Sequence, residues 1–255
     1  MNIDPQERKT GSTNNKKNKR ELPAPDAVLF VIPVIIFVFC KQEEVINHAT
    51  DVTPVKKITR YSNGDEFIQF EYNNNETIKK VTIKNNVSTA GEVTSFDVTY
   101  NNDKTIKELT AADSEKIVAQ YKDDLLTSAD IIQHGKKVAF TNYDYESGNL
   151  KYISIYYSEE EGNIPVLKLI FNYNNSGNVT EITTLYADGK EGDLTYAGKA
   201  KMQYDTNTNP LYQYKDVLAL FWQPASKNNV ITEDRYNKDQ SSSGKYKYAY
   251  TYQNK

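Results

Sequence analysis

One short pattern recurs along this 255-residue chain and limits what it can fold into. A run of alternating apolar and polar residues ends at a tyrosine, a turn rich in Asn, Asp and Gly follows, and a second β-branched run begins. The clearest copy is Phe171–Ile182, with the sequence FNYNNSGNVTEI. Period-two alternation predicts a strand with one apolar face, and the turn predicts that the next strand folds back. The pattern therefore predicts repeated β-hairpins.

Further copies follow from Lys56 to the end of the chain, spaced about 20 to 30 residues apart, which is one hairpin per unit. Their tyrosine-ending runs are Ile58–Tyr61, Phe67–Tyr72, Phe96–Tyr100, Ile117–Tyr121, Thr141–Tyr145 and Ala200–Tyr204. Turns this short leave consecutive strands antiparallel. A long twisted sheet with one apolar face must curl or be covered. We therefore expect an all-β fold, a long antiparallel β-meander of hairpins that is rolled or twisted.

One segment departs from this alternation. Asn209 followed by Pro210 matches an N-cap with proline at the first helical position. Apolar residues then recur at helical spacing as far as Phe221. We expect one short helix, Pro210–Trp222, that covers part of the apolar face.

The end of the chain returns to strands. We expect a strand at Val230–Arg235, a loose loop at Asp239–Gly244 and a last strand. Four tyrosines would lie on one face of that last strand, at positions 246, 248, 250 and 252.

Composition narrows the range of partners. The chain has 31 Lys and Arg against 34 Asp and Glu, and no basic stripe stands out after residue 39. Phosphate binding needs clustered Lys and Arg, so we expect no nucleic-acid partner. The 20 tyrosines favour half-buried strand positions, where the ring packs and the hydroxyl reaches water. The single cysteine, Cys40, makes no internal disulfide and no Cys-based zinc site.

The N-terminal residues resemble a targeting segment. A basic cluster at Lys16–Arg20 precedes an uncharged apolar stretch, Ala27–Phe39, which ends at Cys40. A bilayer span needs about 20 apolar residues, so this stretch is short for a span and fits the hydrophobic region of a signal peptide. Two interpretations remain open. The chain is cut before Cys40 and this cysteine is acylated, or the segment is an uncleaved anchor and the cysteine is incidental.

Three regions follow from these patterns. Residues 1–39 form a polar leader and an apolar signal or anchor, residues 40–55 a tether, and residues 56–255 a single antiparallel β-repeat domain. The tether begins with Lys41–Glu44 (KQEE), directly after the cysteine.

Several stretches together resemble a known family. They are Tyr204-Asp205, Asn209-Pro210, Ser226–Val230 and Tyr248–Tyr252, combined with the lipoprotein-like start. The chain resembles a family of secreted or outer-membrane lipoproteins from Bacteroidetes that is classed as a domain of unknown function. It is also distantly similar to the tyrosine-aspartate repeats of Rhs-type β-shells. The resemblance implies an outer-membrane lipoprotein at the cell envelope, with display on the cell surface as one option, and it implies no activity.

Motifs of the common enzyme classes are absent from the sequence. It has no P-loop, no dinucleotide-binding glycine pattern, no His-Glu-x-x-His and no Gly-x-Ser-x-Gly. His134 is a general-base candidate, but Gln133–Lys136 also fits an exposed turn. Glu159–Asn163 and the set Asp188, Glu191 and Asp193 offer oxygen ligands for calcium, yet both fit solvated loops. We expect no enzyme, no cofactor and no metal.

Three functions remain after this exclusion. The first is a non-catalytic, lipid-anchored envelope protein that presents a β-repeat surface for protein or glycan contact. The second is a carbohydrate-binding module that uses exposed aromatic rings, for which Trp222, Tyr248 and Tyr250 are the candidate ligand contacts. Trp222 at helical spacing also fits the core. The third is an enzyme with a carboxylate and tyrosine site, for which no paired carboxylates stand out.

Overall fold

The structure, a computed structural model, describes residues 59–63, 66–84, 93–112, 114–160, 162–187 and 193–248. These residues form a single antiparallel sheet of 14 strands, in which each strand pairs with its neighbours in sequence. The strands are β1 (Arg60–Asn63), β2 (Glu66–Tyr72), β3 (Ile78–Lys84), β4 (Val93–Tyr100), β5 (Ile106–Ala111), β6 (Lys116–Lys122), β7 (Leu125–Gln133), β8 (Lys136–Glu146), β9 (Asn149–Glu159), β10 (Gly162–Tyr173), β11 (Val179–Ala187), β12 (Leu194–Thr208), β13 (Asn228–Asn237) and β14 (Ser242–Lys247). The predicted all-β meander is confirmed.

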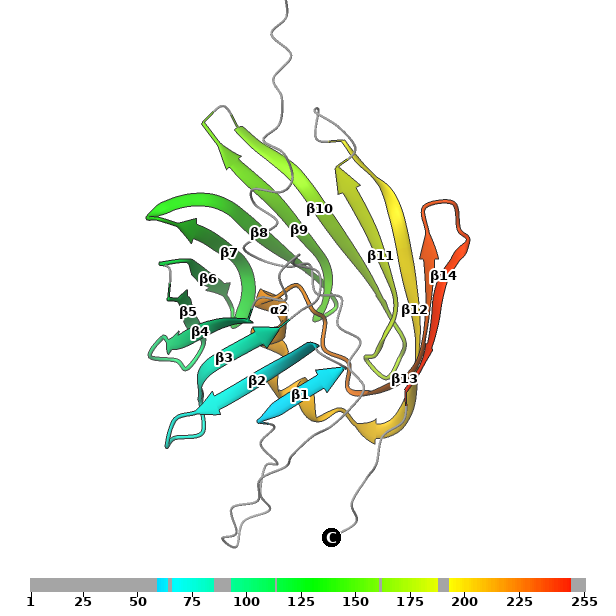
Figure 1. The fold of residues 1–255 in the computed structure, drawn as a ribbon, viewed down its shortest axis with the longest axis horizontal. Helices are drawn as coiled ribbons and strands as arrows, with labels where there is room; N and C mark the ends of the chain where they lie inside the picture. The colour runs from blue at the N-terminus through cyan, green and yellow to red at the C-terminus, as the bar shows by residue number, and fades with distance from the viewer. Residues whose placement is uncertain are drawn as a thin grey trace, which may run out of the picture.

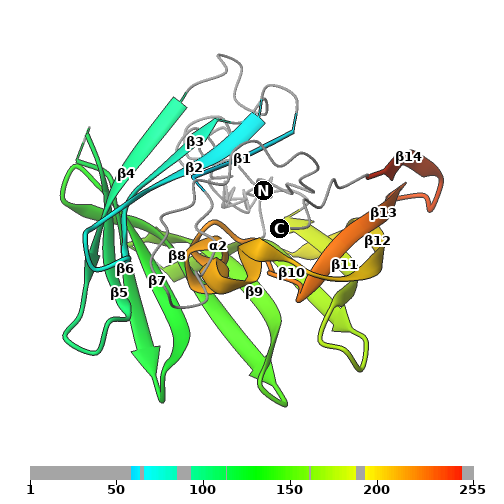
Figure 2. The same cartoon turned by 90° about the horizontal axis from the view of Figure 1, so that it is seen from below.

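The sheet curls into an open shell (Figure 1). Among the described residues β1 and β14 do not pair with each other, so both are edge strands. Figure 2 shows the helical segment inside the concavity, with β1–β4 on one side and β12–β14 on the other. The predicted rolling of the sheet is therefore confirmed, with a helix covering the concave face.

The two faces of the sheet differ in chemistry, as the alternation predicts. The concave face carries the core, and Val81, Leu109, Ile153 and Phe171 are fully buried there. The convex face carries cross-strand polar pairs such as Lys80–Asp97, whose Nζ and Oδ1 lie 3.6 Å apart. Exposed pairs of this kind contribute little to stability, about 0–1 kcal/mol each. Apolar burial on the concave face is what holds the shell together.

Six of the seven repeats place the tyrosine at a β-bulge near the end of an even-numbered strand; the exception is the first, whose Tyr61 lies in β1 without a register shift. A shift of pairing register occurs at all six tyrosines, which we call the strand-end tyrosines: Tyr72, Tyr100, Tyr121, Tyr145, Tyr173 and Tyr204. All six pack against the hydrophobic core. A bulge bends its strand and increases the local right-handed twist. Six bulges on strands that run in the same direction help to curl the sheet.

The predicted helix is confirmed, in two parts. A 3₁₀ turn, η1 (Pro210–Tyr214), leads into α2 (Lys215–Leu220). The Asn209 Oδ1 accepts a hydrogen bond of 2.9 Å from the Leu211 amide, and Pro210 follows as the first helical residue. Leu211, Leu218 and Phe221 are buried, as helical spacing predicts. Val217–Leu220 are four consecutive buried residues, so α2 is buried on more than one side, including the side that faces the concave face of the sheet.

Contacts from the helical segment reach strands far apart in the sequence. The Tyr214 ring stacks on Phe70 of β2 at 4.8 Å between ring centroids, and its hydroxyl lies 2.7 Å from that of Tyr72. The indole Nε1 of Trp222 donates to Thr141 Oγ1 of β8 at 3.1 Å. One short segment thus joins the first hairpins to the middle of the sheet.

One sequence expectation was wrong. Residues 239–244 do not form a loose loop, because the chain turns tightly at 237–241 and β14 begins at Ser242. Gln240 takes a positive φ of 65° there, and the Asp239 carboxylate accepts from the Ser241 amide and hydroxyl. These hydrogen bonds stabilise a tight turn that lacks the Asn-Gly pair usual at such positions. The leader, the anchor and the tether (residues 1–55) lie outside the described residues.

Candidate functional site

Two of the strand-end tyrosines, Tyr100 and Tyr204, join neighbouring hairpins through their hydroxyls, and a third, Tyr72, contacts the helical segment. The Tyr100 hydroxyl donates to the Ile78 carbonyl at 2.9 Å, and the Tyr204 hydroxyl donates to the Val179 carbonyl. Burial, with a smaller effect of Asp216, raises the pKa of Tyr145 to about 12. Its hydroxyl stays protonated at neutral pH and is no base there. We interpret these tyrosines as structural.

A polar concavity lies where β10, β11, β12 and β13 meet at one end of the sheet. It has a volume of about 520 Å³. This volume lies within the range of roughly 300–1,000 Å³ that is usual for small-molecule sites. Its polar lining comes from Asn174, Ser176, Asn178, Thr180, Gln203, Asp205, Thr206 and Asn228. We call it the asparagine pocket. Met202 and Tyr204 add apolar surface.

Two side-chain amides, that of buried Asn178 and that of half-buried Asn228, set the geometry of the asparagine pocket. The Asn178 Nδ2 donates to Asn228 Oδ1 at 2.8 Å, and the Asn228 backbone amide donates to Asn178 Oδ1 at 2.9 Å. Asn178 is 2 % exposed, so this pair is shielded from competing water. The pair fixes the β10–β11 turn to the start of β13, 50 residues later. The walls of the pocket are therefore held in place before any ligand arrives.

Asp205 is the single charged residue among those that line the asparagine pocket. Its Oδ1 accepts from the backbone amides of Asn207 and Asn229, and its Oδ2 accepts from Asn207 Nδ2 at 3.1 Å. Hydrogen bonds from three nitrogens satisfy most of the carboxylate's acceptor capacity. Asp205 therefore orders the loop before η1.

Four groups at the rim of the asparagine pocket are available for a ligand. Within the described part of the chain, no hydrogen bond engages Asn174 Nδ2, the Ser176 hydroxyl, the Gln203 amide or the Thr206 hydroxyl, and all four residues are exposed. They present both donors and acceptors and carry no charge. The pocket thus offers neutral hydrogen-bonding groups on a frame that the Asn178–Asn228 pair holds in place.

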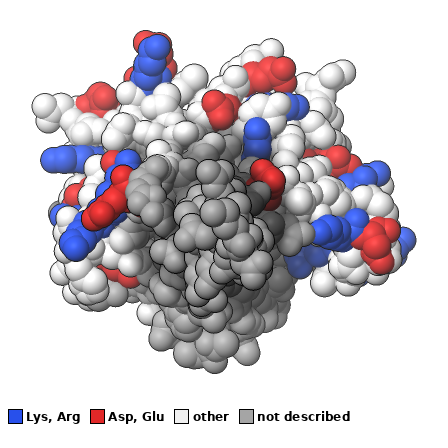
Figure 3. All heavy atoms as spheres, turned by 90° about the horizontal axis from the view of Figure 1, so that it is seen from above, with Lys and Arg blue, Asp and Glu red and all other residues white. Residues whose placement is uncertain are grey.

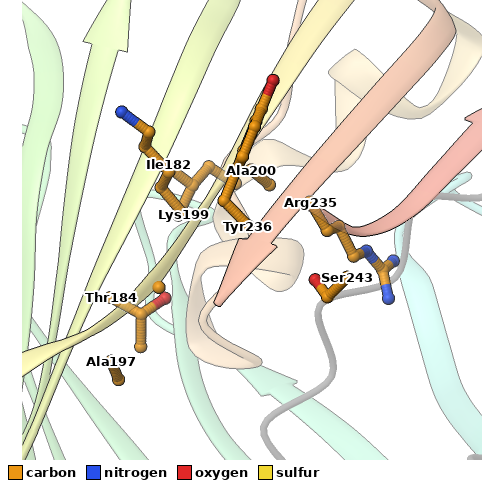
Figure 4. Close-up of a pocket in the computed structure, with 9 residues that line it drawn as sticks. Ile182, Thr184, Ala197, Lys199, Ala200, Arg235, Tyr236 and Ser243 are labelled. Atoms are coloured by element: carbon orange, nitrogen blue, oxygen red, sulfur yellow. The ribbon is translucent and has the colours of Figure 1, made fainter. Parts of the chain in front are cut away.

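A second, smaller cavity of about 210 Å³ lies on the surface of β11–β14 (Figure 4). The figure shows the Arg235 guanidinium beside Ser243 at one side of it. Arg235 is already engaged, because its Nε donates to Glu233 Oε1 at 2.6 Å and its Nη2 to Oε2 at 3.3 Å. Glu233 is fully buried and also accepts from the Tyr248 hydroxyl at 2.7 Å. We interpret this cluster as an ion pair between a buried carboxylate and a partly exposed guanidinium, in which loss of Arg235 would leave the Glu233 charge without its cation.

The structure places the predicted ligand contacts in different environments. Trp222 is 8 % exposed, with its indole N–H bonded to Thr141, so its ring packs in the core. Tyr248 is half-buried and bonded to Glu233. Tyr250 and the lipidation candidate Cys40 lie outside the described residues. Neither Trp222 nor Tyr248 lines the asparagine pocket.

The other candidates occupy turns. His134 is exposed in the β7–β8 turn at a positive φ of 49°, which confirms the turn interpretation. Glu159 and Glu160 are exposed at the β9–β10 turn. In the described ranges, no group of three or more His, Cys, Asp and Glu side chains is arranged to hold a metal ion. Of the second acidic set, Asp188 and Glu191 lie outside those ranges.

Aromatic rings on the convex face pack on one another. Phe140 and Tyr156 face each other across β8 and β9, with ring centroids 4.9 Å apart and an interplanar angle of 10°. The Lys137 Nζ lies 4.7 Å from the Phe140 centroid. Each ring therefore gives one face to its neighbour, as cross-strand aromatic pairs do. On the face that Figure 3 shows, Lys and Arg alternate with Asp and Glu without a patch of one sign.

Sequence reasoning missed the asparagine pocket. Asn174 and Asn178 were interpreted as turn residues, which they are, but the contact with Asn228 joins positions 50 residues apart. The sequence does carry a weak signal, since Asn recurs at 174, 178, 207 and 228. Within the part of the chain that the structure describes, neither helical segment has the length and hydropathy to cross a membrane.

Comparisons with known proteins support the fold of this chain but assign it to no family. No protein-family model and no curated protein matches the chain. It is similar in structure to a porin-like protein from Bacteroides uniformis ATCC 8492, at 12% identity and a TM-score of 0.50, over 74% of this chain and 78% of that one. A weaker likeness links it to TcdB2-TccC3, at 13% identity and a TM-score of 0.25, over 70% of this chain and 10% of that one. The first likeness supports the curved antiparallel meander alone.

Proposed function

We propose that this protein is a non-catalytic, lipid-anchored protein of the cell envelope, which holds a ligand at the surface of its β-repeat shell. The asparagine pocket carries the binding part of this proposal. Its free groups are neutral amides and hydroxyls, and its one carboxylate is engaged by three N–H donors. Such a site binds by hydrogen bonds and holds no poised acid, base or nucleophile.

The anchoring part rests on the N-terminal sequence. A basic cluster, an uncharged apolar stretch and Cys40 follow one another before the first strand of the shell. A cysteine at this place, once it becomes the N-terminus, takes acyl chains that hold the shell at a membrane. One acyl chain gives only reversible membrane binding, so stable anchoring requires more than one chain.

Acyl labelling in a Gram-negative host tests the anchor. The full chain is expressed with an alkyne-tagged fatty acid, and the wild type is expected to carry the label and to sediment with membranes. Cys40→Ala is expected to lose the label. An exposed-site variant, Asn175→Ala, serves as the control for expression and is expected to keep it. An unlabelled wild type, or a label that persists in Cys40→Ala, would contradict the proposal.

A further inference from the structure

We propose that the asparagine pocket is a binding site for a neutral glycan. This inference rests on the proposed function and names its ligand class. The first argument is the chemistry of the free groups. Asn174, Ser176, Gln203 and Thr206 offer amide N–H, amide C=O and hydroxyl groups within one concavity. A sugar presents closely spaced hydroxyls that donate and accept at once, and amides and hydroxyls match that pattern.

The second argument is the apolar part of the pocket. Met202 and Tyr204 line the same concavity as the polar groups. Tyr204 cannot turn outward, because its hydroxyl donates to the Val179 carbonyl and accepts from Ser226 Oγ at 2.8 Å. A pyranose ring has both hydroxyl edges and patches of C–H groups. Met202 is only 7 % exposed, so the half-buried Tyr204 ring supplies the apolar surface that lies next to the free polar groups and is complementary to such a ring.

The third argument is charge. Asp205 is engaged by the Asn207 side chain and two backbone amides. The Lys227 side chain lies against the turn beside the pocket, since a Cβ added to Gly177 would be 3.2 Å from its Nζ. The one charge in the lining is thus an engaged carboxylate, and the nearby Lys227 lies against the adjacent turn, so no free cation in the lining selects a phosphate, a sulfate or an acidic sugar. A neutral ligand is therefore favoured over a charged one.

The fourth argument is rigidity. The partly buried pair of Asn178 and Asn228 holds the walls together, so little conformational entropy is lost when a ligand binds. Without such a frame, exposed turn residues lose more entropy on ordering than their hydrogen bonds return. The frame distinguishes this concavity from the other hairpin ends, where Asn and Thr bond only within their own turn.

A glycan array followed by titration tests the inference. The full-length protein is applied to an array of neutral and acidic glycans, and the strongest neutral oligosaccharide is then titrated calorimetrically. Gln203→Ala/Thr206→Ala removes two free groups and leaves the frame intact. We expect it to weaken binding at least about tenfold, the equivalent of roughly one net hydrogen bond or more. The matched control is Asn175→Ala, which changes the same end of the sheet outside the pocket and is expected to bind as the wild type does.

The outcomes separate this inference from the proposed function. Neutral glycan binding that the double variant loses and the control keeps supports the site. Binding that the double variant retains overturns the site, although the chain would still be a binding protein. Selection of acidic glycans alone, or of none, overturns the neutral-glycan inference. The acyl-labelling result does not depend on the array, so failure of the anchor is recognised separately.

Discussion

Gly198 lies where β12 comes very close to β13. A Cβ at this position would be 2.5 Å from the Tyr236 carbonyl oxygen, which is backbone and cannot rotate away. The pairing of β11 with β12 also shifts register next to Gly198. The absence of a side chain therefore lets two strands approach at a bulge.

Gly198→Ala is expected to lower the free energy of unfolding by about 1–3 kcal/mol, because the two strands must separate to admit the methyl group. Urea unfolding followed by far-UV circular dichroism measures the change. Lys201→Ala, an exposed position on the same strand, is the control and is expected to change stability by less than about 0.5 kcal/mol. Equal stability of Gly198→Ala and wild type would show that the close approach relaxes freely.

The strand-end tyrosines predict a loss of stability at alkaline pH. Burial raises the pKa of Tyr100, Tyr121 and Tyr145 above the value of 10.0 for a free tyrosine. Above pH 10 the unfolded chain releases protons that the folded chain keeps. The stabilisation is therefore complete below the unfolded pKa and is lost as pH rises toward the folded pKa.

Urea midpoints measured from about pH 8 to about pH 11 are expected to fall steeply above the tyrosine pKa of roughly 10. Tyr145→Phe removes one titrating group and is expected to give a shallower fall than the wild type. The difference in tyrosinate absorbance between the wild type and Tyr145→Phe at matched pH checks the cause, because it isolates the Tyr145 ring from the exposed tyrosines and should rise together with unfolding. A rise in this difference well before unfolding would contradict the inferred burial.

At the scale of elements, the N-cap defines where the helical segment begins. Asn209 uses both ends of its amide, because Oδ1 accepts from Leu211 and Nδ2 donates to the Ser226 carbonyl at 2.9 Å. It therefore fixes the start of η1 and the chain that follows α2. Asn209→Ala is expected to cost about 1–2 kcal/mol in thermal or urea unfolding. Lys215→Ala is the control, because Lys215 is exposed and caps η1 only through its backbone amide, and an equal effect of both would contradict the capping role.

The contact between Tyr72 and Tyr214 connects the helical segment to the first hairpin. Their hydroxyl oxygens lie 2.7 Å apart, although the residues are 142 positions apart in sequence. A double-mutant cycle with Tyr72→Phe and Tyr214→Phe removes both hydroxyls and keeps both rings. We expect a coupling energy of about 1 kcal/mol. Strict additivity of the two substitutions would show that the hydroxyls act independently.

At the scale of the whole molecule, the shell is held by two kinds of contact. All strand pairs join neighbours in sequence, which would let an open meander fray from β1 or β14. The helical segment opposes this, since it contacts β2 through Tyr214, β4 through Phe221 and β8 through Trp222. The fold therefore has a local sheet and a long-range connector.

Trp222 is the single tryptophan and reports on that connector directly. Its burial against Thr141 predicts a blue-shifted emission that moves to the red when the helical segment leaves the sheet. We expect the emission shift and the loss of the far-UV β signal to coincide in urea, because undocking exposes the concave core. Tryptophan exposure at a lower urea concentration would show that the helical segment undocks alone.

The sequence by itself determined the strands, their antiparallel order, their buried faces and the helix start at Asn209-Pro210. These features depend on neighbouring residues, because alternation, turn chemistry and capping act within a few positions. The tight turn at 237–241 was missed because no Asn-Gly pair marks it; side-chain bonds from Asp239 stabilise it instead.

Only the tertiary structure decided where function is to be sought. The bulge at each strand-end tyrosine helps to curl the sheet. The curled sheet and the docked helical segment together bury Trp222, and the sequence pattern left open whether this residue is buried or exposed. The pairing of Asn178 with Asn228 builds the pocket from segments 50 residues apart. Contacts over such separations depend on the accumulated twist and register of every strand between them. The tyrosine-ending repeat, which is clear in the sequence, builds the hairpins of the sheet and forms no binding site by itself. The candidate site lies where the turn at 174–178 meets the start of β13.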